Sequence, residues 1–128
     1  VQMERLTLDY GGEMQKLHVI ERAAIFHLRF ETIHPFIDGN GRVGRLLLNL
    51  ELMKEGLPPV NVKFTDRQRY YDCFKHYREN DNDASKMTGL IEEYAMYELK
   101  RYIEIAEQSD TLKSRHPEDF ENECGIEP

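Results

Sequence analysis

The chain has 128 residues and a formal net charge of −7, a size that fits one compact domain. Its 24 Asp and Glu residues outnumber the 17 Lys and Arg residues. This argues against a nucleic-acid partner, because non-specific phosphate binding needs a clustered excess of positive charge. No apolar run approaches the ~20 residues of a membrane span, so no membrane partner is expected either.

The two cysteines, Cys73 and Cys124, are not close in sequence and do not form a metal-binding pair. This usage is typical of a reducing cytoplasm, in which Cys73 would be a small buried apolar side chain. The first residue is Val1 rather than a methionine, so we expect the chain to be a piece of a longer protein.

Apolar residues recur at helical spacing along most of the chain, which predicts an all-α fold. The predicted helices cover residues 1–10, 13–33, 42–55, from 65 or 66 to the polar turn at 80–84, and 84 or 85 to 107. Pro35 ends the second helix, because the residue before a proline is biased away from the helical conformation. Residues 60–64 alternate apolar and polar and predict either a very short strand or an extended linker.

The third predicted helix carries an apolar stripe that is expected to face the core, formed by Val43, Leu46, Leu47, Leu50 and Met53. After residue 107 the chain becomes acidic and poor in apolar residues. We therefore expect a core domain at 1–107 and an acidic C-terminal tail at 108–128 that is loose unless docked.

The segment from residue 34 to residue 45 reads HPFIDGNGRVGR and has the residue types of a nucleotide-phosphate site. Residues 39–41 directly precede a helix, so their N–H groups and the helix dipole can point at an anion. Glycine at 39 and 41 lets the backbone approach phosphate closely. Arg42 and Arg45 are three residues apart, which places both guanidinium groups on one face of the helix.

Two further side chains of this loop are of types that can take part in a reaction. Asp38 supplies one carboxylate, and one carboxylate together with phosphate oxygens and waters is the usual way to hold Mg²⁺. The imidazole of His34 can take a proton from an attacking hydroxyl. A base, a metal ligand and an anion site thus fall within twelve residues.

This string resembles the signature of the Fic family, HPFx(D/E)GN(G/K)R followed by a second arginine, and every position is matched. The flanking pattern is also similar, and the resemblance covers about residues 1–105: Ala23 and Ala24 with His27, Leu46, Leu47 and Asn49, the turn at 56–59, and Asp66 and Arg67 with Tyr70 and Tyr71. The related Doc branch, a group of kinases, carries lysine where this chain has Gly41. The resemblance therefore favours AMP transfer over phosphoryl transfer.

The resemblance implies a protein adenylyltransferase that transfers AMP from ATP to a Ser, Thr or Tyr hydroxyl of a target protein and releases pyrophosphate. His34 would be the general base, and Asp38 would bind Mg²⁺. The implied phosphate ligands are Gly39, Asn40 and Gly41 at the α-phosphate, Arg42 at the β-phosphate and Arg45 at the γ-phosphate. Phe36 would be buried beneath the loop, and Tyr71 and Phe74 are candidates to contact the adenine.

The implied fold is a compact Fic-type helical bundle with the active-site loop between two central helices, and we expect the family's β-hairpin flap to be missing from this sequence. Family members are commonly restrained by a helix bearing (S/T)xxxE(G/N), whose glutamate pairs with the second arginine, here Arg45. The nearest string, Ser114 to Glu118, departs from this pattern at Asp119 and contains Pro117. We therefore expect an inhibitory helix or an antitoxin-like partner from elsewhere, and a homo-oligomer stays open.

Two alternative functions and the role of Tyr70 remain open at this stage. The loop recognises phosphates and not a base, so UTP, GTP or CDP-choline could replace ATP as the donor. A non-catalytic nucleotide-binding or regulatory module is the alternative of a different class, although such a module has no need of His34. His27 is expected to be buried and to support the loop, whereas Tyr70 could belong to the core or contact the nucleotide.

Overall fold

Five α-helices and two short 3₁₀ turns build residues 1–114, the part of the chain that the computed structural model describes. In chain order these elements are α1 (Gln2–Gly11), η1 (Glu13–Lys16), α2 (Val19–Ile33), α3 (Asn40–Lys54), η2 (Phe64–Asp66), α4 (Arg67–Glu79) and α5 (Ser85–Ser114). Residues 1–114 contain no β-strand, which confirms the predicted all-α fold. The segment at 57–63 is an irregular linker rather than a strand.

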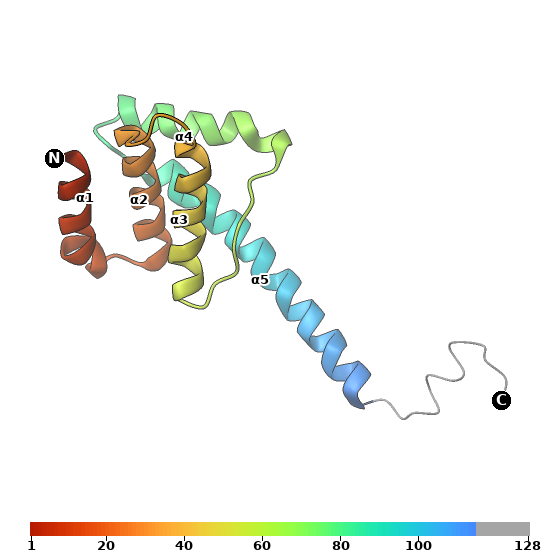
Figure 1. Ribbon diagram of the computed structural model, residues 1–128. Helices are drawn as coiled ribbons and strands as arrows, with labels where there is room; N and C mark the ends of the chain where they lie inside the picture. Colours follow the sequence, from red (N-terminus) through yellow and green to blue (C-terminus); the bar gives the residue numbers. More distant parts are fainter. Residues whose placement is uncertain (115–128) are drawn as a thin grey trace, which may run out of the picture.

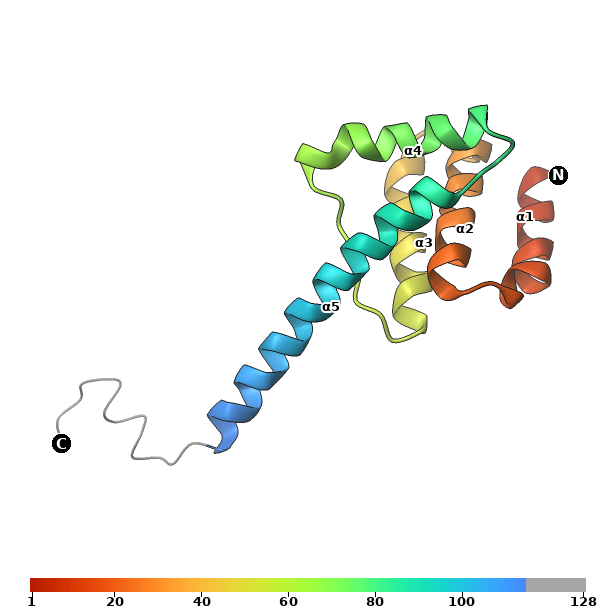
Figure 2. The same cartoon turned by 180° about the vertical axis from the view of Figure 1, so that it is seen from behind.

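α2 is the central helix of the bundle. It packs along α3 on one side and along α1 on the other, while α5 crosses behind α2 and α3 (Figures 1 and 2). α4 lies across one end of α2 and α3 (Figure 1). Leu28, Leu52 and Leu90 are fully buried where α2, α3 and α5 meet, and each such side chain contributes about 1.5–3 kcal/mol of burial free energy.

The predicted helix at 13–33 is wrong in one respect, since it is two elements. η1 ends at Lys16, and Leu17 has extended dihedrals, φ −82° and ψ 153°. The Nδ1 atom of His18 accepts the N–H of Ile20 at 3.3 Å and so caps the start of α2. Periodicity did not show this break, because apolar residues such as Leu17 and Ile20 keep helical spacing across it.

The predicted apolar stripe of α3 is largely wrong. Leu46, Leu50 and Met53 are 69%, 55% and 53% exposed, whereas Leu48 and Leu52 are buried. Apolar residues occupy several faces of this helix, so spacing alone did not identify the face that packs against α2.

α5 continues to Ser114, beyond the predicted end at residue 107, and its C-terminal half projects from the bundle (Figures 1 and 2). Residues 115–128 lie outside the described part of the chain. This range holds most of the predicted acidic tail, Cys124 and all but the first residue of the Ser114 to Glu118 string. No helix within residues 1–114 has the length and apolarity that a membrane crossing requires.

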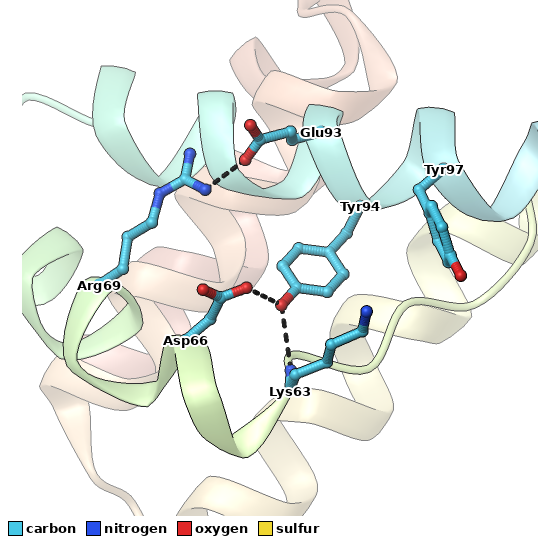
Figure 3. Close-up of a pocket in the computed structure, with 6 residues that line it drawn as sticks. All are labelled: Lys63, Asp66, Arg69, Glu93, Tyr94 and Tyr97. Carbon is cyan, nitrogen blue, oxygen red and sulfur yellow. Dashed lines mark hydrogen bonds and ion pairs between the residues drawn. The ribbon is translucent and has the colours of Figure 1, made fainter.

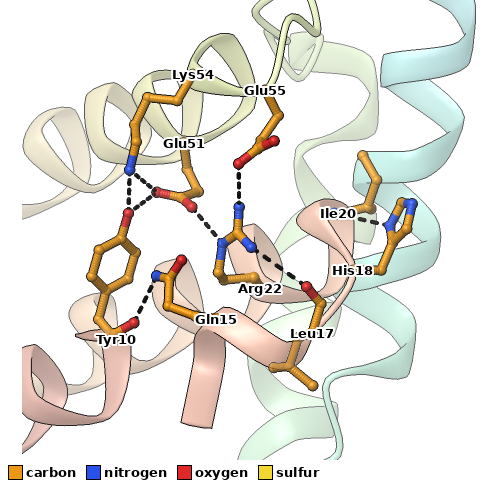
Figure 4. A network of polar contacts seen from close by, with 9 residues as sticks. All are labelled: Tyr10, Gln15, Leu17, His18, Ile20, Arg22, Glu51, Lys54 and Glu55. Atoms are coloured by element: carbon orange, nitrogen blue, oxygen red, sulfur yellow. Dashed lines mark hydrogen bonds and ion pairs between the residues drawn. The ribbon is translucent and has the colours of Figure 1, made fainter. Parts of the chain in front are cut away.

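A buried ion pair ties the central helices together (Figure 4). Arg22 of α2 is 5% exposed, and its Nε donates to Oε1 of Glu51 on α3 at 2.5 Å. The Tyr10 hydroxyl donates to the other oxygen of Glu51 at 2.7 Å. Burial works to raise the pKa of the Glu51 carboxyl, but the hydrogen bonds from Tyr10 and Arg22 outweigh it and hold that pKa below its usual value. Arg22 lies near the start of α2 and Glu51 near the end of α3. The network therefore fixes the two helices against each other at the end opposite the loop that joins them.

Polar contacts also join α4 to α5 around a hollow of about 230 Å³ (Figure 3). The Tyr94 hydroxyl donates to Asp66 and accepts the N–H of Lys63 at 3.1 Å. Arg69 of α4 forms an ion pair with Glu93 of α5. Asp66 stands at the N-cap of α4, as predicted, but its side chain binds Tyr94 instead of capping the helix.

Candidate functional site

The loop between α2 and α3 surrounds a cavity of about 310 Å³. The cavity is lined by His34, Ile37, Asp38, Gly39, Asn40, Gly41, Arg42 and Arg45. The structure thus brings together the seven predicted loop residues, and Ile37 is the one lining residue that the sequence did not single out. Because α3 begins at Asn40, the cavity lies at a helix N-terminus, where free N–H groups and the helix dipole favour an anion.

His34 ends α2 in the left-handed conformation, with φ 55° and ψ 57°. Non-glycine residues rarely adopt this region, and the conformation turns the chain sharply into the loop. The His34 Nδ1 atom lies 3.3 Å from the carbonyl oxygen of Glu31, which can only accept, so Nδ1 carries the hydrogen. The Nε2 atom is left with its lone pair and can accept a proton.

Asn40 holds the loop in shape through its side chain. Its Oδ1 accepts the N–H of Phe36 at 2.9 Å, and its Nδ2 donates to the carbonyl of Phe36 at 2.7 Å. Asn40 is 3% exposed. The carboxamide therefore serves the loop backbone, while the N–H of Asn40 remains one of the helix-terminal donors next to the cavity.

The loop glycines give room to the two arginines. Gly39 has φ +80°, the left-handed region that glycine adopts without strain. A Cβ on Gly41 would lie 3.1 Å from Nη1 of Arg45, and one on Gly39 would lie 3.6 Å from Nη2 of Arg42. The guanidinium groups thus rest over the glycine backbone at the start of α3. Neither arginine takes part in any of the ion pairs formed within residues 1–114.

His27 supports this arrangement from below, as predicted. It is completely buried, with Nδ1 donating to the carbonyl of Gly44 at 3.0 Å and Nε2 accepting from the Tyr70 hydroxyl at 2.6 Å. Burial lowers the pKa of His27 to about 4, so the ring is neutral at pH 7. Burial also raises the pKa of Tyr70 well above its usual value. Tyr70 is therefore a core residue that links α4 to the site.

Glu31 is a residue beside the site whose role sequence reasoning missed. Its Oε1 atom is buried and has no hydrogen-bond partner within residues 1–114. Burial raises the pKa of this carboxyl, opposed by the charges of Arg45 and His34. An acidic residue three positions before His34 on the inner face of α2 was the available signal.

The residues present fit one magnesium ion held mainly by a nucleotide. Asp38 is exposed at the cavity, and its Oδ1 accepts the N–H of Gly39 at 2.8 Å, so the loop backbone engages one of its two carboxylate oxygens. Residues 1–114 hold no group of three or more acidic, His or Cys side chains that could bind a metal. A single carboxylate that works with phosphate oxygens and waters is the arrangement typical of Mg²⁺.

Three aromatic predictions fare differently. Phe36 is 52% exposed, so its predicted burial beneath the loop is wrong, and the contacts between its backbone and Asn40 anchor the loop instead. Tyr71 is 60% exposed, and Phe74 is partly buried beside Tyr70 and His27. Neither Tyr71 nor Phe74 lines the cavity, so adenine contact by these two residues stays a prediction.

This geometry defines a class: an α-helical domain whose central loop presents a histidine and a carboxylate beside a helix N-terminus, together with two arginines that form no ion pair within residues 1–114. A family model described as the Fic/DOC family matches residues 1–52. A protein adenylyltransferase Fic of Drosophila grimshawi is 45% identical over 90% of the chain, and one of Nematostella vectensis is 49% identical over 51%. The solved structure of Fic-1 from C. elegans covers 80% of the chain with a TM-score of 0.71 and 35% identity.

The chain belongs to the Fic/DOC family. It spans 28% of the length of the Drosophila grimshawi protein, 15% of that of Nematostella vectensis and 31% of the solved Fic-1 chain.

Proposed function

We propose that this domain is a protein adenylyltransferase, which transfers AMP from ATP to a Ser, Thr or Tyr hydroxyl of a target protein. The observation that carries the proposal is the convergence of His34, Asp38 and the two arginines on one cavity at the start of α3. Relatives named protein adenylyltransferases, with 45% and 49% identity, support the same activity. Glycine at position 41, rather than lysine, favours AMP transfer over phosphoryl transfer.

In the proposed reaction, Nε2 of His34 takes the proton of the target hydroxyl as its oxygen forms a bond to the α-phosphorus. The bond from the α-phosphorus to the oxygen that bridges it to the β-phosphate breaks. Pyrophosphate leaves, and the target keeps AMP as a phosphodiester. The hydrogen bond from Nδ1 to the Glu31 carbonyl keeps Nε2 available for this proton.

Charge stabilisation would come from the amino end of α3. The N–H groups of residues 39–41 would bind the α-phosphate, while Arg42 and Arg45 would bind the β- and γ-phosphates. Mg²⁺, held by Asp38 and the phosphates, would neutralise charge on the departing pyrophosphate. The protein's own part is then placement and electrostatics, which is what phosphorus chemistry chiefly requires.

Replacement of the base tests the proposal. His34→Ala should abolish transfer of label from α-³²P-ATP to protein, while ATP binding measured by calorimetry stays within about threefold of wild type, because the phosphate ligands are intact. His76→Ala, which changes a histidine away from the cavity, is the matched control and should transfer label normally. Transfer that survived in His34→Ala would show that the assigned base is wrong.

The donor base needs its own experiment, because the loop binds phosphates. Thermal shifts with ATP, UTP, GTP and CDP-choline, compared at equal concentration, should be largest for ATP. A larger shift with another donor would keep the fold and the loop but change the transferred group. ATP binding without any transfer by the wild type, with suitable targets present, would favour the non-catalytic alternative.

The setting of this activity is also a proposal. A reducing cytoplasm suits Cys73, which is buried and unpaired in the structure. Arg45 is exposed at the cavity, so an acidic side chain from an inhibitory helix or an antitoxin-like partner could occupy it and block the γ-phosphate. Residues 1–107 are proposed as the catalytic core, and a homo-oligomer is compatible with it.

A further inference from the structure

Glu31 places a carboxylate in the last turn of α2, beside the cavity but outside the residues that line it. Its Oε1 atom is the one buried side-chain oxygen or nitrogen within residues 1–114 that has no hydrogen-bond partner. Folded proteins satisfy nearly all buried polar atoms, so an unsatisfied carboxylate oxygen next to a ligand site requires an explanation.

A glycine of α3 leaves space for this carboxylate. A Cβ on Gly44 would overlap with Oε1 of Glu31 and would come within 3.0 Å of its Cδ. Gly44 lies inside a helix, where glycine costs about 1 kcal/mol relative to alanine. The glycine therefore gives the Glu31 carboxylate its place against α3 at the expense of helix stability.

The charged groups around Glu31 belong to the proposed site. Arg45 of α3 and His34 at the end of α2 both act on its carboxyl, and Tyr70 of α4 lies within electrostatic range. None of the ion pairs within residues 1–114 includes Glu31. His27, the other ring beneath the loop, is neutral at pH 7 because burial lowers its pKa to about 4. When ionised, Glu31 is thus an unpaired negative charge next to Arg45.

We propose that Glu31 weakens the hold of Arg45 on polyphosphate, so that pyrophosphate can leave after transfer. The inference rests on the proposed function, in which Arg42, Arg45 and a helix N-terminus bind the same two phosphates. Such a site retains its product, and product release limits many enzymes. A fixed carboxylate beside Arg45 repels the β- and γ-phosphates and lowers the affinity for both substrate and product.

The isosteric variant Glu31→Gln tests this by the sign of its effect. Its dissociation constants for ATP and for pyrophosphate, measured by calorimetry, should fall about fivefold, the size expected for one charge in a partly solvated site. The constant for AMP should stay unchanged, because AMP lacks both phosphates that Arg42 and Arg45 would bind. Glu21→Gln, the same change at an exposed position of α2, is the matched control and should bind all three ligands like wild type.

A second variant separates charge from packing. Glu31→Asp keeps the charge and shortens the side chain, so its affinity should stay close to wild type. The gain in Glu31→Gln should shrink at high salt, since screening weakens the repulsion. It should also shrink as the pH falls through the raised pKa of Glu31, because the wild-type carboxyl is then neutral as well.

Weaker or unchanged binding of ATP and pyrophosphate by a folded Glu31→Gln protein would overturn the inference, as would equal tightening in Glu31→Asp. Loss of folding by Glu31→Gln would also contradict it, because replacement of an unpaired and partly buried charge should not destabilise the domain. If the wild type bound neither ATP nor pyrophosphate, the proposed function itself would fail, whatever the variant did.

Discussion

Two asparagines of α3 make the same pair of hydrogen bonds to two different segments, which provides a matched test of the loop. Asn40 binds the N–H and carbonyl of Phe36 at 2.9 and 2.7 Å. Asn49 binds the N–H and carbonyl of Val60 at 2.8 and 3.0 Å. Replacement of either by alanine removes two side-chain bonds, but only Asn40→Ala releases the loop that surrounds the cavity.

The size of the effect follows from those two bonds. Each contributes about 1 kcal/mol net, so Asn40→Ala should lower the free energy of loop opening by about 2 kcal/mol. That corresponds to about 30-fold faster hydrogen exchange at the Phe36 amide, which NMR can follow residue by residue. ATP affinity should fall as well, because binding must then order a loop that the wild type holds in place.

Asn49→Ala is the control, since it removes the same chemistry nine positions further along the helix. Exchange at the Val60 amide should rise, while exchange at Phe36 and ATP affinity stay at wild-type values. If Asn40→Ala lost ATP affinity with Phe36 still fully protected, the carboxamide would contact the nucleotide directly, and the reasoning from its hydrogen bonds would be refuted.

Three further predictions concern the framework of the site. Glu51→Gln should destabilise the domain by about 1.5–3 kcal/mol in urea unfolding, because the buried Arg22 loses one of its two carboxylate partners and keeps only Glu55; a cost below 1 kcal/mol would contradict this. The pKa of His27 falls from 6.5 to about 4 on folding, so its contribution is complete above pH 6.5 and is lost as the pH falls towards 4; unfolding free energy should drop by about 2 kcal/mol from pH 7 to pH 5, and a His27→Asn variant should lack this component. Tyr70→Phe should cost about 1–3 kcal/mol in thermal unfolding, because Nε2 of His27 loses its donor, and an unchanged midpoint would argue against that hydrogen bond.

The candidate site was predictable because its geometry is local. Twelve consecutive residues span the end of one helix and the start of the next, and their spacing alone places the glycines at the helix N-terminus and the arginines on one face. The contacts between helices that support the site were harder to predict from the sequence. Tyr70 lies 43 positions from His27, and sequence spacing cannot show that a residue of α4 meets a residue of α2.

The failures have physical causes of the same kind. Burial of Phe36 depended on how the loop packs, and the structure anchors its backbone through Asn40 rather than its ring through the core. The inner face of α3 depended on which neighbours pack there, since Leu46 and Leu48 are equally apolar. The sequence shows that Glu31 is an acidic residue within a predicted helix. Its unsatisfied oxygen could not be predicted, because it lies against Gly44, which belongs to another helix.

The polyphosphate binding that we propose is compatible with an acidic domain, because, in the part of the chain that the structure describes, carboxylates pair with some of its arginines and not with others. Arg22 is paired with Glu51 at 2.5 Å and Arg29 with Asp9 at 2.9 Å, and both serve the framework. Arg42 and Arg45 take part in none of the ion pairs within residues 1–114, so their charge acts on the cavity although the whole chain carries −7. Attraction at such a site is local, since exposed charges are screened beyond about 8 Å at physiological salt. Affinity for a triphosphate then depends on charges adjacent to Arg42 and Arg45, such as Glu31, and hardly at all on the net charge of the domain.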